Sequence, residues 1–312
     1  FTNLHRGLSG TNVAINTNIW TWAGWHGEKW TTKAPMPTGR EYLAAAALGG
    51  KIYALGGYVS INTNEEYSPI TDSWRVLKEM PTGRQELTAV AAGGRIFALG
   101  GDNHQGVNES YDSALNTWIS FQSGAALEDS GAVAIAGNIY SIGGLSRSYR
   151  INACIGMCRP PAPTLIFTPT AINYEYSLVP NVWISRTAMS SARYRFATAA
   201  VNGRAYALGG FGPLSTNEEY DPVYNSWRIR REMPAARAYH AAAAVGGKIF
   251  AFGGENAAAV LNSNEEYDPA SDVWAARQTM PTPRTKLAAA ASGGKIYVMG
   301  GADNIARFQI NE

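Results

Sequence analysis

The sequence contains few of the side chains that bind transition metals. Its 312 residues include two cysteines, Cys154 and Cys158, and four histidines. Zinc and copper enzymes usually gather three or four such ligands at one site, so we expect neither a metal nor another cofactor. No apolar run reaches the length of about 18 residues that a membrane-spanning helix needs.

Charge is also sparse and nearly balanced. Lysine and arginine number 26 and aspartate and glutamate 24, so the formal net charge is only +2. Proteins that bind nucleic acid or an anionic membrane surface through their overall charge are usually far more basic, and we expect neither partner. Hydrophobic residues make up 46% of the chain, enough for a large core. The length fits one closed all-β domain.

What the chain does contain is a repeat. Its tryptophans recur at Trp30, Trp74, Trp118, Trp183, Trp227 and Trp274. The residues ten positions later are Arg40, Arg84, Glu128, Arg193, Arg237 and Arg284 in turn. A glycine doublet follows each of these, and in five repeats a tyrosine stands seven residues before the next tryptophan. Landmarks that keep this register six times indicate a repeat architecture.

Each repeat predicts four short β-strands separated by turns. In the second repeat, residues 87–92 and 95–99 flank the turn at Gly93-Gly94, and two further strands follow. Runs of alanine such as residues 241–244 have helical propensity, but they are too short to nucleate a helix. Small side chains suit the innermost strand of a blade, because the blades crowd around one axis.

These landmarks resemble the kelch repeat, as in GGKIYALGG and NEEYSPITDSW between Gly49 and Trp74. The resemblance extends from about Trp30 to the end of the chain. It implies an all-β fold, a six-bladed β-propeller of kelch repeats. It also implies that the repeated tyrosines and tryptophans pack neighbouring blades against each other.

The sixth repeat ends at Glu312, before its tryptophan. Closure of the ring therefore needs an outer strand from elsewhere in the chain. Residues 28–36, EKWTTKAPM, match the outer strand that is missing there. We therefore expect this N-terminal strand with Trp30 to complete the C-terminal blade and to pair with residues 305–310, which removes an open sheet edge. Residues 28–312 then form a single propeller domain, and residues 1–27 are an N-terminal extension outside the repeat.

Large differences in loop length fall between the glycine doublet and the tyrosine, and repeat proteins often bind ligands on the face that carries such loops. The residues expected on that face are Arg40, Tyr42, Arg84, Glu128, Arg193, Arg195, Arg237, Tyr239, His240, Arg284 and Lys286. In kelch domains, arginines at matching positions bind acidic groups of peptide partners, and a guanidinium pairs well with a carboxylate. The resemblance therefore implies a non-catalytic module for an acidic peptide, protein or glycan ligand. The alternative is that the repeated arginines brace their own blades.

The third repeat departs from the others by an insertion at about residues 145–175. Its two cysteines either form a disulfide, Cys154–Cys158, or remain free thiols. A disulfide, together with the glycosylation triplet that begins at Asn108, favours an extracellular protein. The insertion has two alternative positions, as a lid over the central channel or packed on the rim of its blade.

An enzymatic alternative comes from other kelch propellers, which include sialic-acid mutarotases and copper oxidases. Copper chemistry needs two histidines and a Cys–Tyr pair at the axis, whereas both cysteines of this chain lie in the insertion. A mutarotase needs only a positioned acid or base and an arginine that binds the anionic group of the sugar. The candidates for that role are Glu86, Glu128 and His240.

Overall fold

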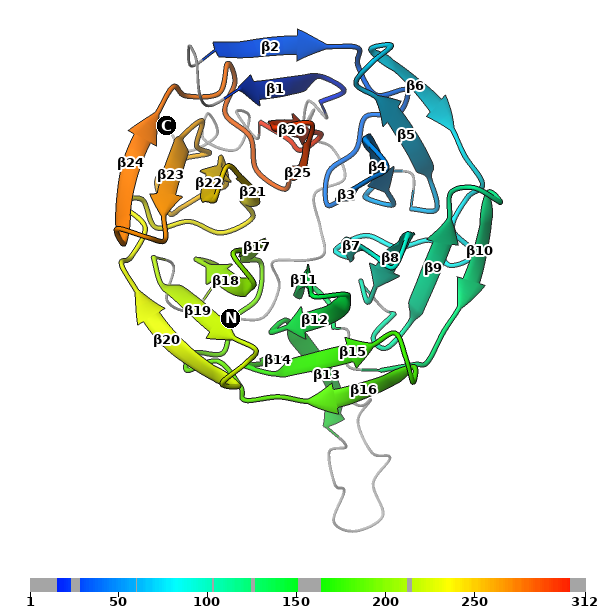
Figure 1. The fold of residues 1–312 in the computed structure, drawn as a ribbon, viewed down its shortest axis with the longest axis vertical. Helices are drawn as coiled ribbons and strands as arrows, with labels where there is room; N and C mark the ends of the chain where they lie inside the picture. Colours follow the sequence, from blue (N-terminus) through cyan, green and yellow to red (C-terminus); the bar gives the residue numbers. More distant parts are fainter. Residues whose placement is uncertain are drawn as a thin grey trace, which may run out of the picture.

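The structure, a computed structural model, describes residues 16–23, 29–59, 61–102, 104–124, 127–150, 164–211 and 215–303. Six four-stranded antiparallel sheets stand around a central axis as the blades of a disc (Figure 1). The expected six-bladed all-β propeller is confirmed. None of the described residues belongs to a helix that is long and apolar enough to cross a membrane.

The strands of the first three blades follow in order from the axis outward. Blade 1 comprises β3 (Ala44–Leu48), β4 (Lys51–Leu55), β5 (Asn64–Ser68) and β6 (Ser73–Val76). Blade 2 comprises β7 (Thr88–Ala92), β8 (Arg95–Leu99), β9 (Asn108–Asp112) and β10 (Thr117–Ser120). Blade 3 comprises β11 (Gly131–Ile135), β12 (Asn138–Ile142), β15 (Asn173–Ser177) and β16 (Val182–Ser185).

The other three blades have the same order. Blade 4 comprises β17 (Ala197–Val201), β18 (Arg204–Leu208), β19 (Asn217–Asp221) and β20 (Ser226–Arg230). Blade 5 comprises β21 (Ala241–Val245), β22 (Lys248–Phe252), β23 (Asn264–Asp268) and β24 (Val273–Arg277). Blade 6 comprises β25 (Ala288–Ser292), β26 (Lys295–Met299), β1 (Ile19–Ala23) and β2 (Lys29–Lys33).

The hydrophobic core lies between neighbouring blades. The innermost strands β3, β21 and β25 each begin with four alanines, because larger side chains would collide near the axis. Behind them, larger residues fill the space between one blade and the next. Tyr53 of blade 1, for example, packs against Tyr111 of blade 2 with ring centroids 6.1 Å apart.

The repeated aromatic residues join the blades at the rim, as the repeat predicts. In blade 1 the rings of Tyr67 and Trp74 lie 5.2 Å apart. The indole N–H of Trp74 donates to the carbonyl of Ala34, just after β2 of blade 6, at 2.9 Å. The tryptophans that bond in the same way to the preceding blade are Trp30, Trp118, Trp183, Trp227 and Trp274. These residues act in blade-to-blade packing.

The N-terminal part of the chain closes the ring with two strands. Trp30 is buried in the outer strand β2, as expected. The expected partner is wrong, because β2 pairs with β1 and places Trp22 opposite Trp30. Strand β1 pairs in turn with β26. Residues 19–23 therefore belong to blade 6 and do not form an extension outside the repeat, while residues 305–310 lie outside the described residues.

The sequence missed β1 because its landmark residues differ from those of the other third strands. Trp22 occupies the place that a tyrosine holds elsewhere, and it precedes Trp30 by eight residues instead of seven. Trp22 is nevertheless completely buried, and its ring lies 5.3 Å from that of Trp30. In the sequence Ile-Trp-Thr-Trp, Ile19 and Thr21 alternate with Trp20 and Trp22. This alternation was the feature of the sequence that indicates a strand.

The insertion of blade 3 forms a hairpin of β13 (Leu145–Arg150) and β14 (Thr164–Pro169). The hairpin extends outward past β16 at the rim of the disc (Figure 1). A lid over the channel is therefore not the position of its described part. The predicted disulfide of Cys154 and Cys158 lies outside the described residues.

The glycosylation triplet is enclosed by the fold. Asn108 is buried at the start of β9, and its side-chain amide donates to the carbonyl of Gln122 at 3.0 Å. The folded chain does not present this asparagine at its surface. The triplet therefore gives no support to an extracellular location.

Candidate functional site

A closed ring of backbone hydrogen bonds encircles the axis on one face of the disc. Each blade contributes one residue, whose N–H donates to the carbonyl of the ring residue in the preceding blade at 2.9–3.2 Å. All six residues have positive φ angles between 53° and 58°. We call them the axial ring: Tyr42, Glu86, Asp129, Arg195, Tyr239 and Lys286.

The left-handed backbone of the axial ring is unfavourable for residues other than glycine. Its repetition in all six blades, with a hydrogen bond to each neighbour, shows that the closed ring holds it in place. Side chains from non-adjacent blades then meet across the axis. Tyr42 of blade 1 contacts Tyr239 of blade 5 with centroids 5.7 Å apart, and Arg195 of blade 4 lies 3.9 Å from Glu86 of blade 2.

The ring residues belong to a wider set that surrounds the channel opening. In each blade, the residue just before the ring residue pairs with the residue just after the glycine doublet. In blade 1, for example, Glu41 precedes Tyr42 and pairs with Tyr58. Together these three positions in six blades form what we call the mouth. Its members are residues 41, 42, 58, 85, 86, 102, 128, 129, 145, 194, 195, 211, 238, 239, 255, 285, 286 and 302.

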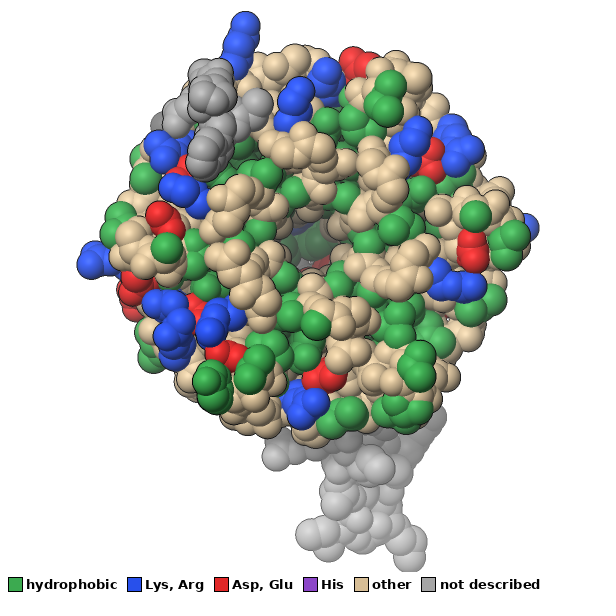
Figure 2. All heavy atoms as spheres, in the orientation of Figure 1, with side chains coloured by type: hydrophobic (Ala, Val, Ile, Leu, Met, Phe, Trp, Pro, Cys, Tyr) green, Lys and Arg blue, Asp and Glu red, His purple; other side chains and the backbone are tan. Residues whose placement is uncertain are grey.

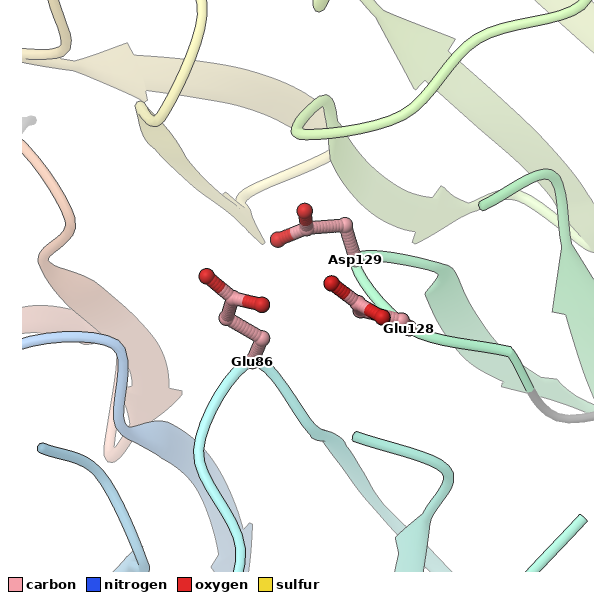
Figure 3. A group of neighbouring side chains, drawn as sticks. All are labelled: Glu86, Glu128 and Asp129. Atoms are coloured by element: carbon pink, nitrogen blue, oxygen red, sulfur yellow. The ribbon is translucent and has the colours of Figure 1, made fainter. Parts of the chain in front are cut away.

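Three carboxyl groups converge on the side of the mouth formed by blades 2 and 3. Glu86, Glu128 and Asp129 have carboxylate oxygens within 4.8 Å of one another, and all three side chains are buried (Figure 3). We call them the acidic trio. Glu86 comes from the turn before β7, and the other two come from the turn before β11 (Figure 3).

Two arginines balance part of this charge. Arg195 donates from Nε to Asp129 at 2.9 Å, and Arg147 of β13 donates from Nε to Glu128 at 2.6 Å. Arg147 also pairs with Asp102. The four carboxylates Glu86, Asp102, Glu128 and Asp129 thus share two guanidinium groups. We assign no metal to the trio, since each of its three members already lies within 3.9 Å of an arginine nitrogen.

Burial without full charge balance raises the pKa values of two members of the trio, Glu86 and Asp129. Burial, together with the nearby Asp129, raises the pKa of Glu86 well above its ordinary value. Burial also raises the pKa of Asp129 to about 6, although the ion pair with Arg195 acts in the opposite direction. Burial therefore favours the protonated forms of Glu86 and Asp129 more than it would for exposed carboxyl groups.

Aromatic rings from blades 1, 4 and 5 line the rest of the mouth. Tyr194 and Phe211 stack with centroids 5.2 Å apart. The guanidinium of Arg195 lies over the ring of Tyr239 at 4.5 Å, and the ammonium of Lys286 lies over that of Tyr42 at 4.7 Å. Each of the two basic ring residues is thus held by aromatic rings as well as by a carboxylate.

The five repeated arginines do not reach the mouth. Their side chains are at most 1% exposed. Arg40 donates to the carbonyl of Gly56 at 2.8 Å and to the carboxylate of Glu65 in β5 at 2.6 Å. Equivalent carboxylate pairs join Arg84 to Glu109, Arg193 to Glu218 and Arg237 to Glu265. The expectation that Arg40, Arg84, Arg193, Arg237 and Arg284 face a ligand is wrong, because each is enclosed in its own blade, and the bracing alternative fits.

Blade 3 lacks this brace altogether. Elsewhere, the second glycine of each doublet donates its N–H to the carbonyl of the repeated arginine in the next blade. Gly101 of blade 2 donates instead to the carbonyl of Leu127, so Leu127 stands in the arginine position of blade 3. Glu128 is one residue further on, and the expected match of Glu128 to the arginines is wrong by one residue. The place of the glutamate partner is taken by Tyr174. Blade 3 has therefore lost both the arginine and its glutamate partner, with Leu127 and Tyr174 in their places.

His240 is not part of the mouth chemistry. It is 5% exposed, and both ring nitrogens lack a hydrogen-bond partner among the described residues. Burial first, and the charge of Arg237 second, lower its pKa well below the ordinary value. Of the three predicted catalytic residues, only Glu86 and Glu128 are brought together.

Several residues of the site were not predicted, namely the mouth residues Asp102, Asp129, Tyr194 and Phe211 and the neighbouring Arg147. Asp102 and Phe211 directly follow a glycine doublet. The residue at that position differs in every blade, although the doublet before it does not. That contrast is the sequence signal that could have found them.

Other hollows in the disc are less suited to a ligand. One of about 470 Å³ lies between blades 1 and 2 and is lined by Lys51, Glu66 and Arg75. Glu66 is already paired with Arg75 at 2.8 Å and lies 3.8 Å from Lys51. On the face shown in Figure 2, charged side chains lie toward the rim and mainly uncharged atoms surround the central hollow. The acidic trio is the densest charge cluster that we find at the axis.

Comparison with known families supports the architecture. Residues 39–81, 192–234 and 236–281 match the Kelch motif. These segments correspond to blades 1, 4 and 5, each of which retains the arginine–glutamate brace. No curated protein matches the chain.

Proposed function

Since the chain is a six-bladed kelch-repeat propeller, we propose that it is an interaction module that binds a protein ligand at the mouth. The observation that carries the proposal is the division of its residues into two sets. Repeated residues, such as Arg40 and Trp74, are engaged in holding the blades together. Residues that differ from blade to blade are collected at the mouth, where a rigid scaffold presents them.

The charge of the mouth supports a basic ligand. Its carboxylates are Glu41, Glu86, Asp102, Glu128, Asp129 and Glu255, six in all, against Arg195, Lys286 and the incoming Arg147. The expectation of an acidic ligand rested on the five repeated arginines. Because these side chains are enclosed in their blades, they cannot bind such a ligand at the mouth. We propose instead that a lysine or arginine of the partner approaches the acidic trio, with Tyr42 and Tyr239 available for cation–π contact.

Binding of basic peptides to the purified protein tests the proposal. Glu86→Gln keeps the shape of the side chain, removes its charge and leaves no tightly paired arginine without a partner. We expect it to weaken binding of arginine-containing peptides by about tenfold, the effect of one charge-assisted contact. Glu232→Gln, the same change on the exposed rim of blade 4, is the matched control. Equal affinity of the two variants, or a preference for acidic peptides, would contradict the proposal.

The sugar-active alternative retains one supporting observation. Glu86 and Glu128 lie together, and two neighbouring carboxyl groups can act as an acid–base pair. His240 does not join them, and the nearby arginines are already paired. Proton NMR of anomer exchange in reducing sugars, including sialic acid, tests this alternative. Exchange that the protein accelerates and Glu128→Gln abolishes would favour the enzyme over the module.

A further inference from the structure

The hairpin β13–β14 differs from all the blades in having only two strands. An isolated two-stranded ribbon is marginally stable in water, and three or more strands are usually needed for independent stability. The hairpin begins beside blade 2 at the mouth, and the end of β13 extends past the rim of blade 3 (Figure 1). Each of its strands has one edge that faces away from the other strand, and further strands could pair only along these two edges.

The outer edge of β13 is already occupied. The N–H of Leu145 donates to the carbonyl of Glu128 at 2.8 Å. The side-chain amide of Gln105 then continues the pattern as a substitute for a strand. It donates to the carbonyl of Leu145 at 2.9 Å and accepts from the N–H of Arg147 at 3.2 Å. No further strand can pair along this part of β13.

The outer edge of β14 is different. The N–H of Thr170 donates to the carbonyl of Gly144 at 2.9 Å, which fixes the alternation of the ladder. Even-numbered residues of β14 face β13, so Leu165 and Phe167 direct their N–H and C=O groups outward. Within the described parts of the chain, no strand pairs with these groups and no other hydrogen bond to them is found.

The composition of this edge favours pairing. The strand reads Thr-Leu-Ile-Phe-Thr-Pro and carries no charge. Leu165 and Phe167 are 36% and 41% exposed. Edge strands of natural proteins usually carry a lysine, a bulge or an inward charge that prevents pairing with another chain. β-branched and aromatic residues without such a charge make β14 a suitable pairing strand.

We propose that β14 pairs antiparallel with β14 of a second copy of this chain. The strand matches itself about Ile166, because Leu165 then lies opposite Phe167 of the second copy and the reverse. Both positions have outward N–H and C=O groups, so the pairing satisfies all of them with reciprocal hydrogen bonds. Two marginal hairpins become one four-stranded sheet, the same size as a blade. Pro169 has no N–H, which ends the ladder at that position.

The proposed register predicts a specific cross-link. Ile166 faces its own counterpart in a non-hydrogen-bonded pair, where the Cα atoms of an antiparallel sheet are about 4.5 Å apart. In a chain with Cys154→Ser and Cys158→Ser, Ile166→Cys should therefore form a disulfide-linked dimer under mild oxidation. Thr168→Cys is the matched control, since it faces residue 164 of the second copy and should not cross-link. Equal cross-linking of the two variants would overturn the register.

Solution mass tests the association without cysteines. Light scattering of the unaltered chain should show a mass that rises from one chain toward two as concentration increases. Leu165→Pro removes only an outward N–H, and Phe167→Lys adds a charge to the edge. Each should raise the dissociation constant by about tenfold or more. Ser148→Lys places the same charge on β13 and should leave the constant unchanged. A single-chain mass at every concentration, or equal effects of the two lysines, would overturn the proposal.

Discussion

Arg284 lies over the indole of Trp20, with its guanidinium carbon 3.7 Å from the ring centroid. In blades 1, 2, 4 and 5 the equivalent arginine meets a glutamate of the third strand. Strand β1 supplies the third strand of blade 6, and its register places Trp20 where those glutamates stand. Burial lowers the pKa of Arg284 to about 9, with Asp303 opposing the shift. Its guanidinium thus meets carbonyls, the Thr282 hydroxyl and an aromatic face in place of a glutamate of the third strand.

This difference predicts unequal costs for the same substitution. Arg84→Met should reduce the free energy of unfolding by about 3–5 kcal/mol, because it leaves Glu109 buried and uncompensated. Arg284→Met leaves no buried glutamate without a partner, so it should cost only about 1–2 kcal/mol in lost hydrogen bonds and cation–π contact. Denaturant unfolding of both variants measures the difference. Equal losses would show that the carboxylate partner does not determine the cost.

Ring closure by two strands predicts the effect of truncation. Deletion of residues 1–36 removes half of the strands of blade 6, exposes the edge of β26 and takes away Trp22 and Trp30. Loss of one buried tryptophan alone costs about 3–5 kcal/mol, so the truncated chain should melt far below the full chain. A synthetic peptide of residues 16–36 should raise its melting temperature progressively, with the logarithm of the peptide concentration once that exceeds the dissociation constant. An unchanged melting temperature after truncation would contradict closure by β1 and β2.

His240 occupies the position that Leu43, Leu87 and Leu287 hold in other blades, and its ring nitrogens have no hydrogen-bond partner among the described residues. His240→Leu should therefore stabilise the fold by about 1–3 kcal/mol, the cost of a buried unsatisfied polar group. The pKa of His240 is lowered in the folded state, so the unfolded chain binds a proton more readily. Stability should fall as the pH drops below about 6.5, and the leucine variant should lose this dependence.

Thermal unfolding at pH 7.5 and pH 5 measures both effects. Leu287→His is the reverse change in blade 6 and should destabilise, more strongly at the lower pH. A leucine variant that is less stable than the parent at both pH values would show that the imidazole has a partner in the folded protein.

Asp129 should show the opposite pH dependence. Its folded pKa is about 6, above the value of about 3.9 for an unfolded aspartate. The folded chain therefore binds more protons between about pH 6 and pH 4, and stability rises as the pH falls through that window. In a His240→Leu background, the gain from pH 7 to pH 5 should be about 1 kcal/mol. Glu86 contributes in the same direction.

Asp129→Asn in that background should reduce the pH dependence, whatever it does to stability at a single pH. Denaturant midpoints at pH 7 and pH 5 provide the comparison. The matched control is Asp112→Asn, which changes a carboxylate of β9 that pairs with Arg95 on the body of blade 2. An undiminished pH dependence in Asp129→Asn would place the titrating group elsewhere.

The sequence by itself determined the blade architecture. Trp74 and its equivalents, the glycine doublets and the alternating strands specify where each strand begins and turns. These signals act over a few residues, so they can be read without tertiary contacts. The closing strand with Trp30 was predictable for the same reason, because its segment repeats the pattern of Trp74.

Only the tertiary structure decided the direction and the partners of the side chains at these positions. Arg40 stands in a loop that the sequence assigns to the mouth, yet its guanidinium turns inward to Glu65, 25 residues further along the chain. Glu86 and Asp129 come from different blades and meet only because the axial ring fixes their turns in the left-handed conformation. Spacing along a chain fixes the path of the backbone, but burial and partners at long range decide the direction of a side chain. The charge of the mouth therefore followed from strand register and blade closure, which no local pattern encodes.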